Sequence, residues 1–270
     1  MLTDFLRYAI GEPDKYEINR PYYVLKGDGV YLYKSTGALL MKKLFTGFGE
    51  KRVPGLVKGE EGVEYQLPKV PFRYWLMILD FYKEVYEKNG TEASVHIFHK
   101  KDGKDIPDNY LTDETYSKGV LVEGDWVVYC PKQRNTATIT EFGDDEFYQW
   151  LRVNLIPVIE THSHHKMDAF WSQTDNDNQQ DEQYYGVYGR IGTKDKFLMK
   201  HVVGGEYTNI PVTDVFEFPT VETVQVVTQI EGYEIQGVED KTEVVPYEGV
   251  FKSRNEYPEE WFEMIQGNRK

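Results

Sequence analysis

The chain has a single cysteine, Cys130, among its 270 residues. An intramolecular disulfide is therefore impossible, and a zinc site built from several thiolates is excluded as well. The sequence also lacks any apolar run of the roughly 18 residues that a membrane-spanning helix needs. Residues 1–20 contain no apolar stretch of the secretory type. These absences predict a cytoplasmic protein with no membrane partner.

Positive charge is scarce, because 31 Lys and Arg stand against 45 Asp and Glu and give a formal net charge of −14. A surface of this sign repels a phosphate backbone, so we expect no nucleic-acid partner. A protein or a peptide is the partner that we expect instead. The hydrophobic fraction of 40% is sufficient for a packed core, and the 21 tyrosines favour strands.

The N-terminal quarter of the chain has the pattern of a small β module. Residues 22–26 and 30–34 are two aromatic-rich runs on either side of a glycine-containing turn, which predicts a hairpin. Residues 63–67 alternate between apolar and polar side chains, as in a strand with one buried face. We therefore place a β module at residues 1–70.

A long helix and a series of strands follow this module. Residues 71–89 have apolar side chains at three- and four-residue spacing, with Pro71 at the start and Gly90 after the end. The patterns then predict strands at 93–99, 119–122, 126–129, 136–142, 156–164, 184–191 and 197–203, a loop at 100–118, a helix at 144–153, a weakly helical segment at 172–183, β-prone runs at 223–230 and 233–238, and an amphipathic piece at 258–265. We expect a central domain at 71–215 and a C-terminal extension at 216–270.

The segment between His162 and Asp175 has the residue types of a metal site. Side chains alternate across a strand, so His162 and His164 share one face of the strand predicted at 156–164. Two imidazoles and one carboxylate can hold zinc with an open fourth position, which is the arrangement of catalytic zinc. Two interpretations need no metal: surface histidines on a strand, and a helix N-cap box formed by Ser172 and Asp175.

This segment resembles the motif of the JAB/JAMM (MPN-plus) metallopeptidases, which is His-x-His, seven residues, Ser, two residues, Asp. The spacing from His164 to Ser172 and on to Asp175 matches the motif throughout. The resemblance implies His162, His164 and Asp175 as zinc ligands. It implies Ser172 as a donor that steadies the attacking water or the oxyanion. It also implies an α/β fold of JAMM type, related to cytidine deaminases, in which helices flank a mixed sheet.

The family also uses an upstream glutamate, which takes a proton from the water and passes it to the leaving amine. Glu92 occupies the corresponding place, between the predicted helix and the strand at 93–99. Glu160 is a rival, because it lies two positions before His162 and therefore on the same strand face. Alternatively, Glu160 orients one of the imidazoles from behind.

The chain departs from the family pattern at two places. His165 stands where a proline usually follows the second histidine, and strand alternation directs it away from the metal face. The strand after Glu92 has the sequence Ser-Val-His-Ile at 94–97 and lacks the glycines that are usual there. His96 and His99 are candidates for additional metal contacts, although strand histidines are more often packing or surface residues.

The resemblance implies a zinc-dependent peptidase or isopeptidase. More loosely, the N-terminal module is similar to that of family members on bacterial mobile elements, which are often encoded beside E1-like activating enzymes and ubiquitin-like proteins. The implied substrate is then the C-terminal tail of a ubiquitin-like protein, and the implied partner is an E1-like enzyme from the same locus. Two alternatives stay open, namely a phage-type endopeptidase of cell-wall peptides and a non-catalytic MPN-like scaffold.

Overall fold

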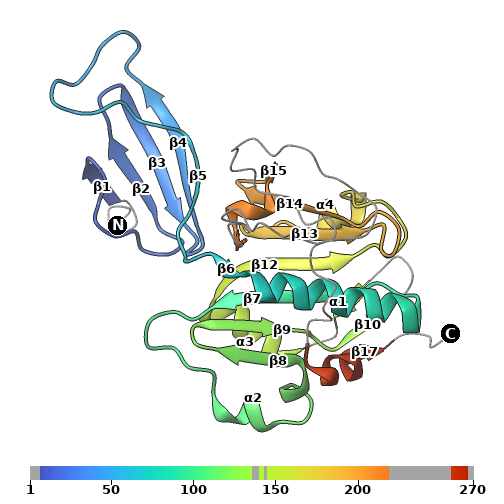
Figure 1. The fold of residues 1–270 in the computed structure, drawn as a ribbon. Coiled ribbons are helices and arrows are strands. Elements are labelled where there is room, and N and C mark those ends of the chain that lie inside the picture. Colours follow the sequence, from blue (N-terminus) through green and yellow to red (C-terminus); the bar gives the residue numbers. More distant parts are fainter. Residues whose placement is uncertain (1–6, 136–139, 143–144, 219–256, 267–270) are drawn as a thin grey trace, which may run out of the picture.

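The computed structural model describes residues 7–135, 140–142, 145–218 and 257–266, and it is a mixed α/β structure with several sheets and few helices (Figure 1). The strands of its largest sheet are β7 (Ser94–His99), β8 (Val120–Glu123), β9 (Trp126–Tyr129), β12 (Ile156–Ser163), β13 (Tyr184–Gly189), β14 (Lys196–Val203) and β15 (Glu206–Ile210). Their order across the sheet is β15-β14-β13-β12-β7-β9-β8. β12 and β13 pair in parallel, and the other neighbours pair antiparallel. The α/β class expected from the sequence is confirmed.

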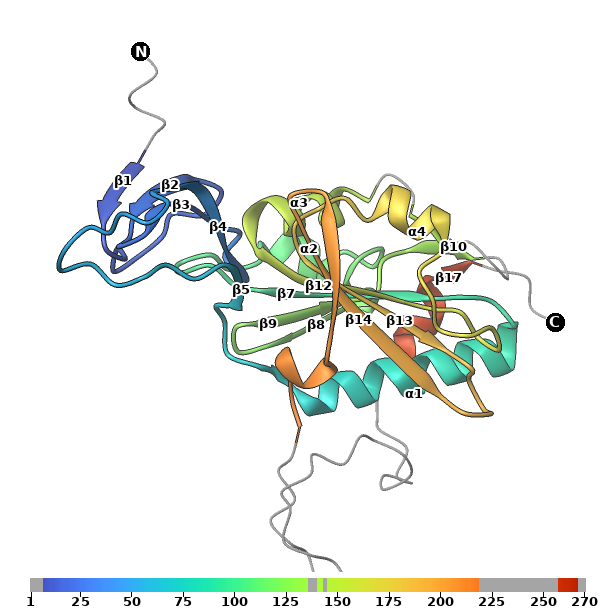
Figure 2. The ribbon, with the colours of Figure 1, turned by 90° about the horizontal axis from the view of Figure 1, so that it is seen from above.

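Helices cover both faces of this sheet, as Figure 2 shows. α1 (Phe72–Asn89) runs along one face, and α3 (Glu146–Asn154) lies over the other. Thr161 of β12 faces α1 and is hydrogen-bonded to the Tyr82 hydroxyl at 2.7 Å. Because side chains alternate along a strand, the adjacent His162 faces the side of α3. Among the described helices, none has the length and apolar character needed to cross a bilayer.

The first long helix begins and ends almost where its sequence pattern predicts. The helix begins at Phe72, one residue after the predicted start, and Pro71 is its N-cap with φ −53° and ψ 132°. Gly90 ends the helix in the left-handed conformation at φ 68°, which glycine adopts without steric cost. Its backbone N–H donates to the carbonyls of Val85 and Tyr86. The chain therefore leaves the helix sharply and enters β7 four residues later.

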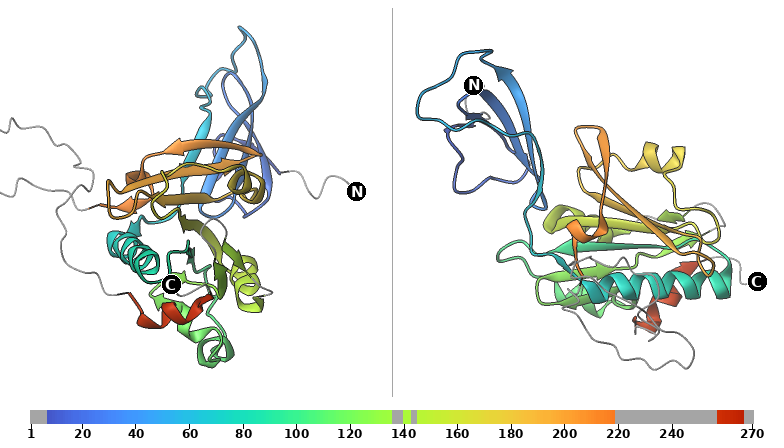
Figure 3. Two further views of the ribbon diagram at one scale, coloured as in Figure 1. Left: turned by 90° about the vertical axis from the view of Figure 1, so that its right-hand side faces the viewer. Right: turned by 45° about the horizontal axis from the view of Figure 1, so that its top comes forward.

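A second sheet forms the N-terminal module and projects from the central layers (Figure 3). Its strands, in spatial order, are β1 (Arg7–Ile10), β2 (Pro21–Leu25), β3 (Gly29–Ser35), β4 (Leu39–Gly47) and β5 (Gly62–Tyr65). The predicted hairpin is β2 and β3. Lys34 forms an ion pair with Glu182 at 2.6 Å, and the Tyr65 and Tyr184 rings lie 5.6 Å apart. Leu39 belongs to the core beneath α1, so the module packs against the central domain.

Two predicted segments differ in detail from the structure. Residues 100–118, predicted as a loop, contain the short helix α2 (Asp108–Thr112). Of the strand predicted at 136–142, β11 (Thr140–Phe142) is present, whereas residues 136–139 lie outside the described part. β11 pairs antiparallel with β10 (Gln133–Asn135), a strand that the sequence analysis did not predict.

The described part of the C-terminal extension joins the central domain. A 3-10 helix, η3 (Glu259–Met264), leads into β17 (Ile265–Gln266), which pairs in parallel with β10. Trp261 is fully buried, and its ring lies 5.3 Å from that of Phe81 in α1. The β-prone runs predicted between residues 223 and 238 lie outside the described residues.

Candidate metal centre

The end of β12 brings two histidines to one place. His162 is the penultimate residue of the strand, and His164 follows its end. The His164 backbone N–H donates to the Tyr188 carbonyl at 2.7 Å, which extends the pairing with β13 beyond the strand. The Nε2 atoms of the two histidines are consequently only 3.1 Å apart. Their side chains are 11% and 5% exposed, so the pair lies at the edge of the core.

Asp175 reaches these histidines from α4 (Gln173–Asn178), whose N-terminus is a capping box. Ser172 Oγ accepts from the Asp175 backbone N–H at 3.0 Å. In return, Asp175 Oδ2 accepts from the Ser172 N–H at 2.8 Å and from its hydroxyl at 2.7 Å. The box places Asp175 Oδ1 3.2 Å from His162 Nε2 and Oδ2 3.6 Å from His164 Nε2. The N-cap interpretation is thus confirmed, and the same cap directs the carboxylate toward the imidazoles.

The three donor groups fit a single metal ion. Their ligand atoms all lie within 4.8 Å of one another, and the closest separations are 3.1, 3.2 and 3.6 Å. Bond lengths of roughly 2.0–2.2 Å in tetrahedral zinc correspond to ligand separations of roughly 3.3–3.6 Å. Two unprotonated imidazole nitrogens this close repel each other, and a cation between them removes that repulsion. The donor set of two nitrogens and one oxygen is one that zinc accepts.

The charges of this cluster depend on one another. Burial opposes the charge on Asp175, but hydrogen bonds from both imidazoles and from Ser172 outweigh it and hold the pKa of the carboxyl far below its usual range. Burial also opposes a charge on His164, yet Asp175 and Glu92 together raise its pKa. The cluster therefore stabilises a positive charge, either a proton or a metal cation, among its carboxylates.

Strand register places Glu92 beside the histidines. β7 and β12 are antiparallel and pair Ser94 with His162. Two hydrogen bonds of 3.0 Å between Ala93 and the residue separating the histidines continue this pairing past the end of β7. The next pair in the same register is Glu92 with His164. The structure thus brings the predicted proton carrier next to a predicted ligand from which it is distant in sequence.

The environment of Glu92 suits proton transfer. The residue is only 4% exposed. Burial raises the pKa of its carboxyl to about 8, an effect that His164 opposes and Asp175 reinforces. A carboxyl whose pKa lies near neutrality can both accept and release a proton at physiological pH.

Two buried amides that the sequence analysis did not single out hold the Glu92 segment. Asn135 donates from Nδ2 to the Glu92 carbonyl at 2.6 Å. Gln133 accepts from the Ser94 backbone N–H at 2.8 Å and donates to the Ser94 carbonyl at 2.9 Å. Both belong to β10 and are buried. Their spacing of two residues is a signal of a shared strand face, but nothing in the sequence shows which backbone they meet.

Glu160, the rival of Glu92, faces a different histidine. Its Oε2 atom lies 3.7 Å from His96 Nδ1 and accepts from Gln183 at 3.5 Å. His96 is buried and forms hydrogen bonds of 3.2 Å with Ser94 Oγ and with the Tyr148 hydroxyl. Burial lowers the pKa of His96 to about 3, so this imidazole is neutral. The imidazole that Glu160 adjoins is thus a packing residue and not a member of the metal cluster.

The excluded His165 and the remaining candidate, His99, lie outside the cluster. His165 stacks on the Tyr86 ring of α1 at 5.7 Å. Its φ is 38°, a value that proline cannot adopt because its ring fixes φ near −65°. The departure from the family motif therefore accompanies a left-handed turn after His164. His99 donates from Nδ1 to the Lys100 carbonyl at 2.8 Å and packs edge-on against Trp126.

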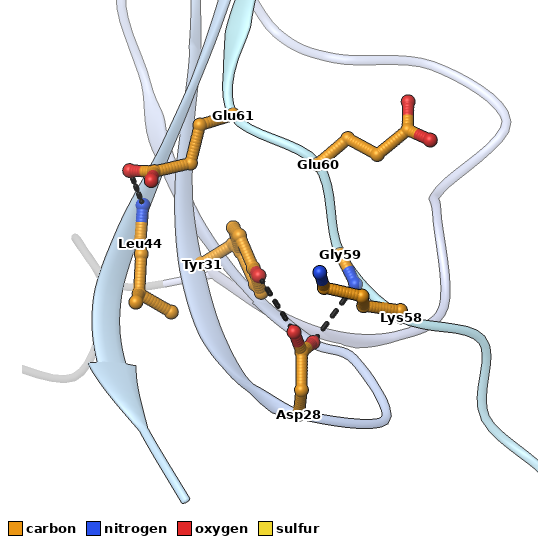
Figure 4. A pocket seen from close by; sticks show the side chains of 7 residues that line it. All are labelled: Asp28, Tyr31, Leu44, Lys58, Gly59, Glu60 and Glu61. Carbon is orange, nitrogen blue, oxygen red and sulfur yellow. Dashed lines mark hydrogen bonds between the residues drawn. The ribbon is translucent and has the colours of Figure 1, made fainter. Parts of the chain in front are cut away.

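A separate open pocket of about 530 Å³ lies in the N-terminal module (Figure 4). It is lined by Asp28, Tyr31, Leu44, Lys58, Gly59, Glu60 and Glu61. Asp28 accepts from the Gly59 N–H at 2.8 Å and from the Tyr31 hydroxyl at 3.2 Å. Glu61 accepts from the Leu44 N–H at 2.8 Å. Two of its carboxylates therefore attach the chain between β4 and β5 to the sheet, and the pocket shares no residue with the metal centre.

The candidate metal centre is the feature of the structure on which a functional assignment can rest. It combines three side chains that could hold a metal ion, at the end of β12 and in α4, with a buried glutamate beside them. When the chain is compared with known proteins, no family model and no curated protein matches it.

Proposed function

We propose that this protein is a zinc-dependent peptidase or isopeptidase of the JAB/JAMM type. The observation that carries the proposal is the convergence of His162, His164 and Asp175 at separations suited to one zinc ion. The mixed sheet, with α1 on one face and the histidines on the other, supports a JAMM-type fold. The buried Glu92 beside His164 supports hydrolysis as the reaction, because a hydrolytic site needs a proton carrier.

The reaction needs an attacking water and a leaving nitrogen that acquires a proton. A zinc ion held by His162, His164 and Asp175 would supply Lewis acidity toward the attacking water and the scissile carbonyl. The Glu92 carboxylate takes the proton from the attacking water and delivers it to the leaving nitrogen. In the structure, the Ser172 hydroxyl donates to Asp175 at 2.7 Å, so its primary role is to orient a ligand. To stabilise an oxyanion as well, this hydroxyl must turn away from Asp175.

The proposed substrate is the extended C-terminal tail of a ubiquitin-like protein, and the proposed partner is an E1-like enzyme from the same locus. Phe170 supports an extended peptide near the metal, because it is 44% exposed and its ring lies 4.9 Å from that of His164. An apolar side chain of a bound tail can pack against this ring. The net charge of −14 favours a substrate with a basic surface.

The direct test is hydrolysis by the purified zinc-loaded protein. It is incubated with a fusion of the ubiquitin-like protein encoded nearest to its own gene, and separately with cell-wall peptides, and the products are identified by mass. We expect cleavage after the terminal glycine of the fusion, and complete loss of cleavage with a zinc chelator. Glu92→Gln should retain zinc and lose nearly all turnover, whereas Glu160→Gln should remain active.

Three outcomes separate the alternatives. Cleavage of cell-wall peptides with none of the fusion identifies the phage-type endopeptidase. Zinc binding without hydrolysis of either substrate identifies the non-catalytic scaffold. An active Glu92→Gln together with an inactive Glu160→Gln assigns the proton transfer to the other glutamate.

A further inference from the structure

The helix that supplies Asp175 has little packing of its own. α4 is six residues long, and none of its residues is buried. A helix this short is unstable by itself, so its position depends on its contacts with the rest of the molecule. The hairpin of β14 and β15, which lies beside α4 (Figure 1), makes one contact with α4 itself and one with Trp171, just before the helix.

Lys200 of β14 makes the first contact. It is only 1% exposed, and its Nζ donates to Asn176 Oδ1 at 3.0 Å. The ammonium also lies 4.3, 4.9 and 5.8 Å from the ring centroids of Trp171, Tyr207 and Tyr185. Burial of an ammonium is costly without partners, and aromatic faces attract a cation. This lysine is therefore fixed in place and fixes the residues that it touches.

Asn209 of β15 makes the second contact. It pairs directly with Lys200 across the hairpin, so both side chains leave the same face of the sheet. Its Oδ1 atom accepts from Trp171 Nε1 at 2.9 Å. The two paired residues thus hold Trp171 and Asn176, which flank the segment 172–175. The hairpin therefore contacts the chain on both sides of the capping box.

The charges of Lys200 and Asp175 add to these contacts. Burial lowers the pKa of Lys200, and the negative charge of Asp175 opposes that effect. The ammonium and the carboxylate therefore stabilise each other without a direct hydrogen bond between them. A cation held behind α4 favours the ionised carboxylate that a metal ligand requires.

We propose that Lys200, with Asn209 opposite it, is a positioning residue for the metal centre. It acts through Asn176 and Trp171, which set the place and orientation of the turn that presents Asp175. The inference rests on the proposed zinc-dependent function, because it concerns how well the same three ligands hold the metal.

The test compares metal binding in matched variants of the full chain. Lys200→Met keeps the length of the side chain and removes its charge. We expect its zinc dissociation constant, measured by competition with a chromophoric chelator, to rise about 10- to 100-fold. The visible absorption spectrum of the cobalt-loaded variant should also change, because it reports the arrangement of the ligands. Lys194→Met, which removes one exposed positive charge before β14, is the control and should leave both readouts unchanged.

A second variant tests the route through Asn176. Asn176→Ala should weaken zinc binding as Lys200→Met does. The zinc affinity of the double variant should then equal that of whichever single variant binds zinc more weakly. Additive losses contradict this route, and a zinc affinity of Lys200→Met equal to that of Lys194→Met overturns the proposal. If Lys200→Met does not fold, Asn176→Ala decides alone, since unchanged affinity and an unchanged cobalt spectrum then overturn it. A wild-type chain that binds neither zinc nor cobalt removes the proposed function itself, which distinguishes the two failures.

Discussion

Asp175 caps a helix and is also the proposed carboxylate ligand of the metal. Its Oδ2 atom closes the capping box by accepting from Ser172, and the same group lies 3.2 Å from His162 Nε2. The hydrogen bonds that lower the pKa of this carboxyl outweigh its burial. Asp175 is thus ionised and already oriented toward both imidazoles, which would reduce the reorganisation on binding the proposed metal.

The first prediction at this scale concerns metal content. We expect one zinc per chain in protein purified without chelator, measured by elemental analysis. The double variant His162→Ala, His164→Ala should bind none, because two of three donors are gone. His99→Ala removes a histidine that lies outside the cluster and is the control, and it should keep the full zinc content. Full-strength zinc binding by the double variant contradicts the site.

The second prediction at this scale concerns pH and Glu92. The pKa of this carboxyl is raised to about 8 in the folded chain, against roughly 4.3 for an unperturbed glutamate. Below the unperturbed pKa, Glu92 is protonated in both the folded and the unfolded state, and its contribution to the free energy of unfolding is fully present. As pH rises toward 8, the unfolded state releases its proton while the folded state keeps it, so the free energy of unfolding falls.

Glu92→Gln removes this pH dependence. In metal-free protein at pH 8 we expect the variant to be more stable than the wild type by a few kcal/mol at most, at about 1.4 kcal/mol for each unit of pKa difference. The gain should disappear near pH 4. Urea unfolding with a chelator at several pH values measures it, and Glu206→Gln on the exposed strand β15 controls for the substitution. A gain that is equal at all pH values contradicts the assignment.

At the scale of elements, three residues of the candidate metal centre lie at or just beyond the ends of strands and helices. His164 lies just beyond β12, Glu92 lies just before β7, and Asp175 is in the first turn of α4. Strand pairing with β7 and β13 fixes the first two, and the capping box fixes the third. Regular elements thus fix the positions of all three side chains.

Ser172→Ala tests the junction at α4. Loss of an N-cap hydroxyl costs about 1 kcal/mol, and the unsupported Asp175 carboxylate should bind zinc about tenfold more weakly. Urea unfolding of the metal-free protein and chelator competition measure the two effects. Thr174→Ala changes an exposed residue of the same helix and should alter neither. An unchanged zinc affinity of Ser172→Ala would show that the box does not support the ligand.

At the scale of the whole molecule, segments distant in sequence share one core. Trp261, close to the C-terminus, packs against Phe81 of α1 and against Tyr257. Leu39 of the N-terminal module belongs to the same core cluster. One core cluster therefore joins the N-terminal module, α1, β12 and the described C-terminal residues.

Trp261→Ala should lower the free energy of unfolding by about 3–5 kcal/mol, because it removes a fully buried aromatic side chain. Trp261→Phe should cost much less. It keeps an aromatic ring, and the indole Nε1 that it removes is buried and has no hydrogen-bond partner among the described residues. Urea unfolding of the zinc-loaded protein tests both. Equal losses for the two variants would contradict a packing role for the ring.

The sequence predicted the elements whose signals are local. The helix α1 has a 3.6-residue period, and the β2–β3 hairpin has a turn between two aromatic runs. No strand was predicted at β4, because its last five residues are all exposed. It therefore has no alternation between buried and exposed side chains. α2 was not predicted because it is five residues long and buries none of them.

The same division applies to the metal centre. The sequence by itself singled out His162, His164, Ser172 and Asp175, through strand alternation, a local N-cap pattern and the resemblance to the JAB/JAMM motif. Only the tertiary structure placed Glu92 opposite His164, since that depends on the register between β7 and β12. It alone brought Lys200 and Asn209 behind α4. Contacts between distant strands are decided by which faces are buried together, and burial is a property of the whole fold rather than of any short segment.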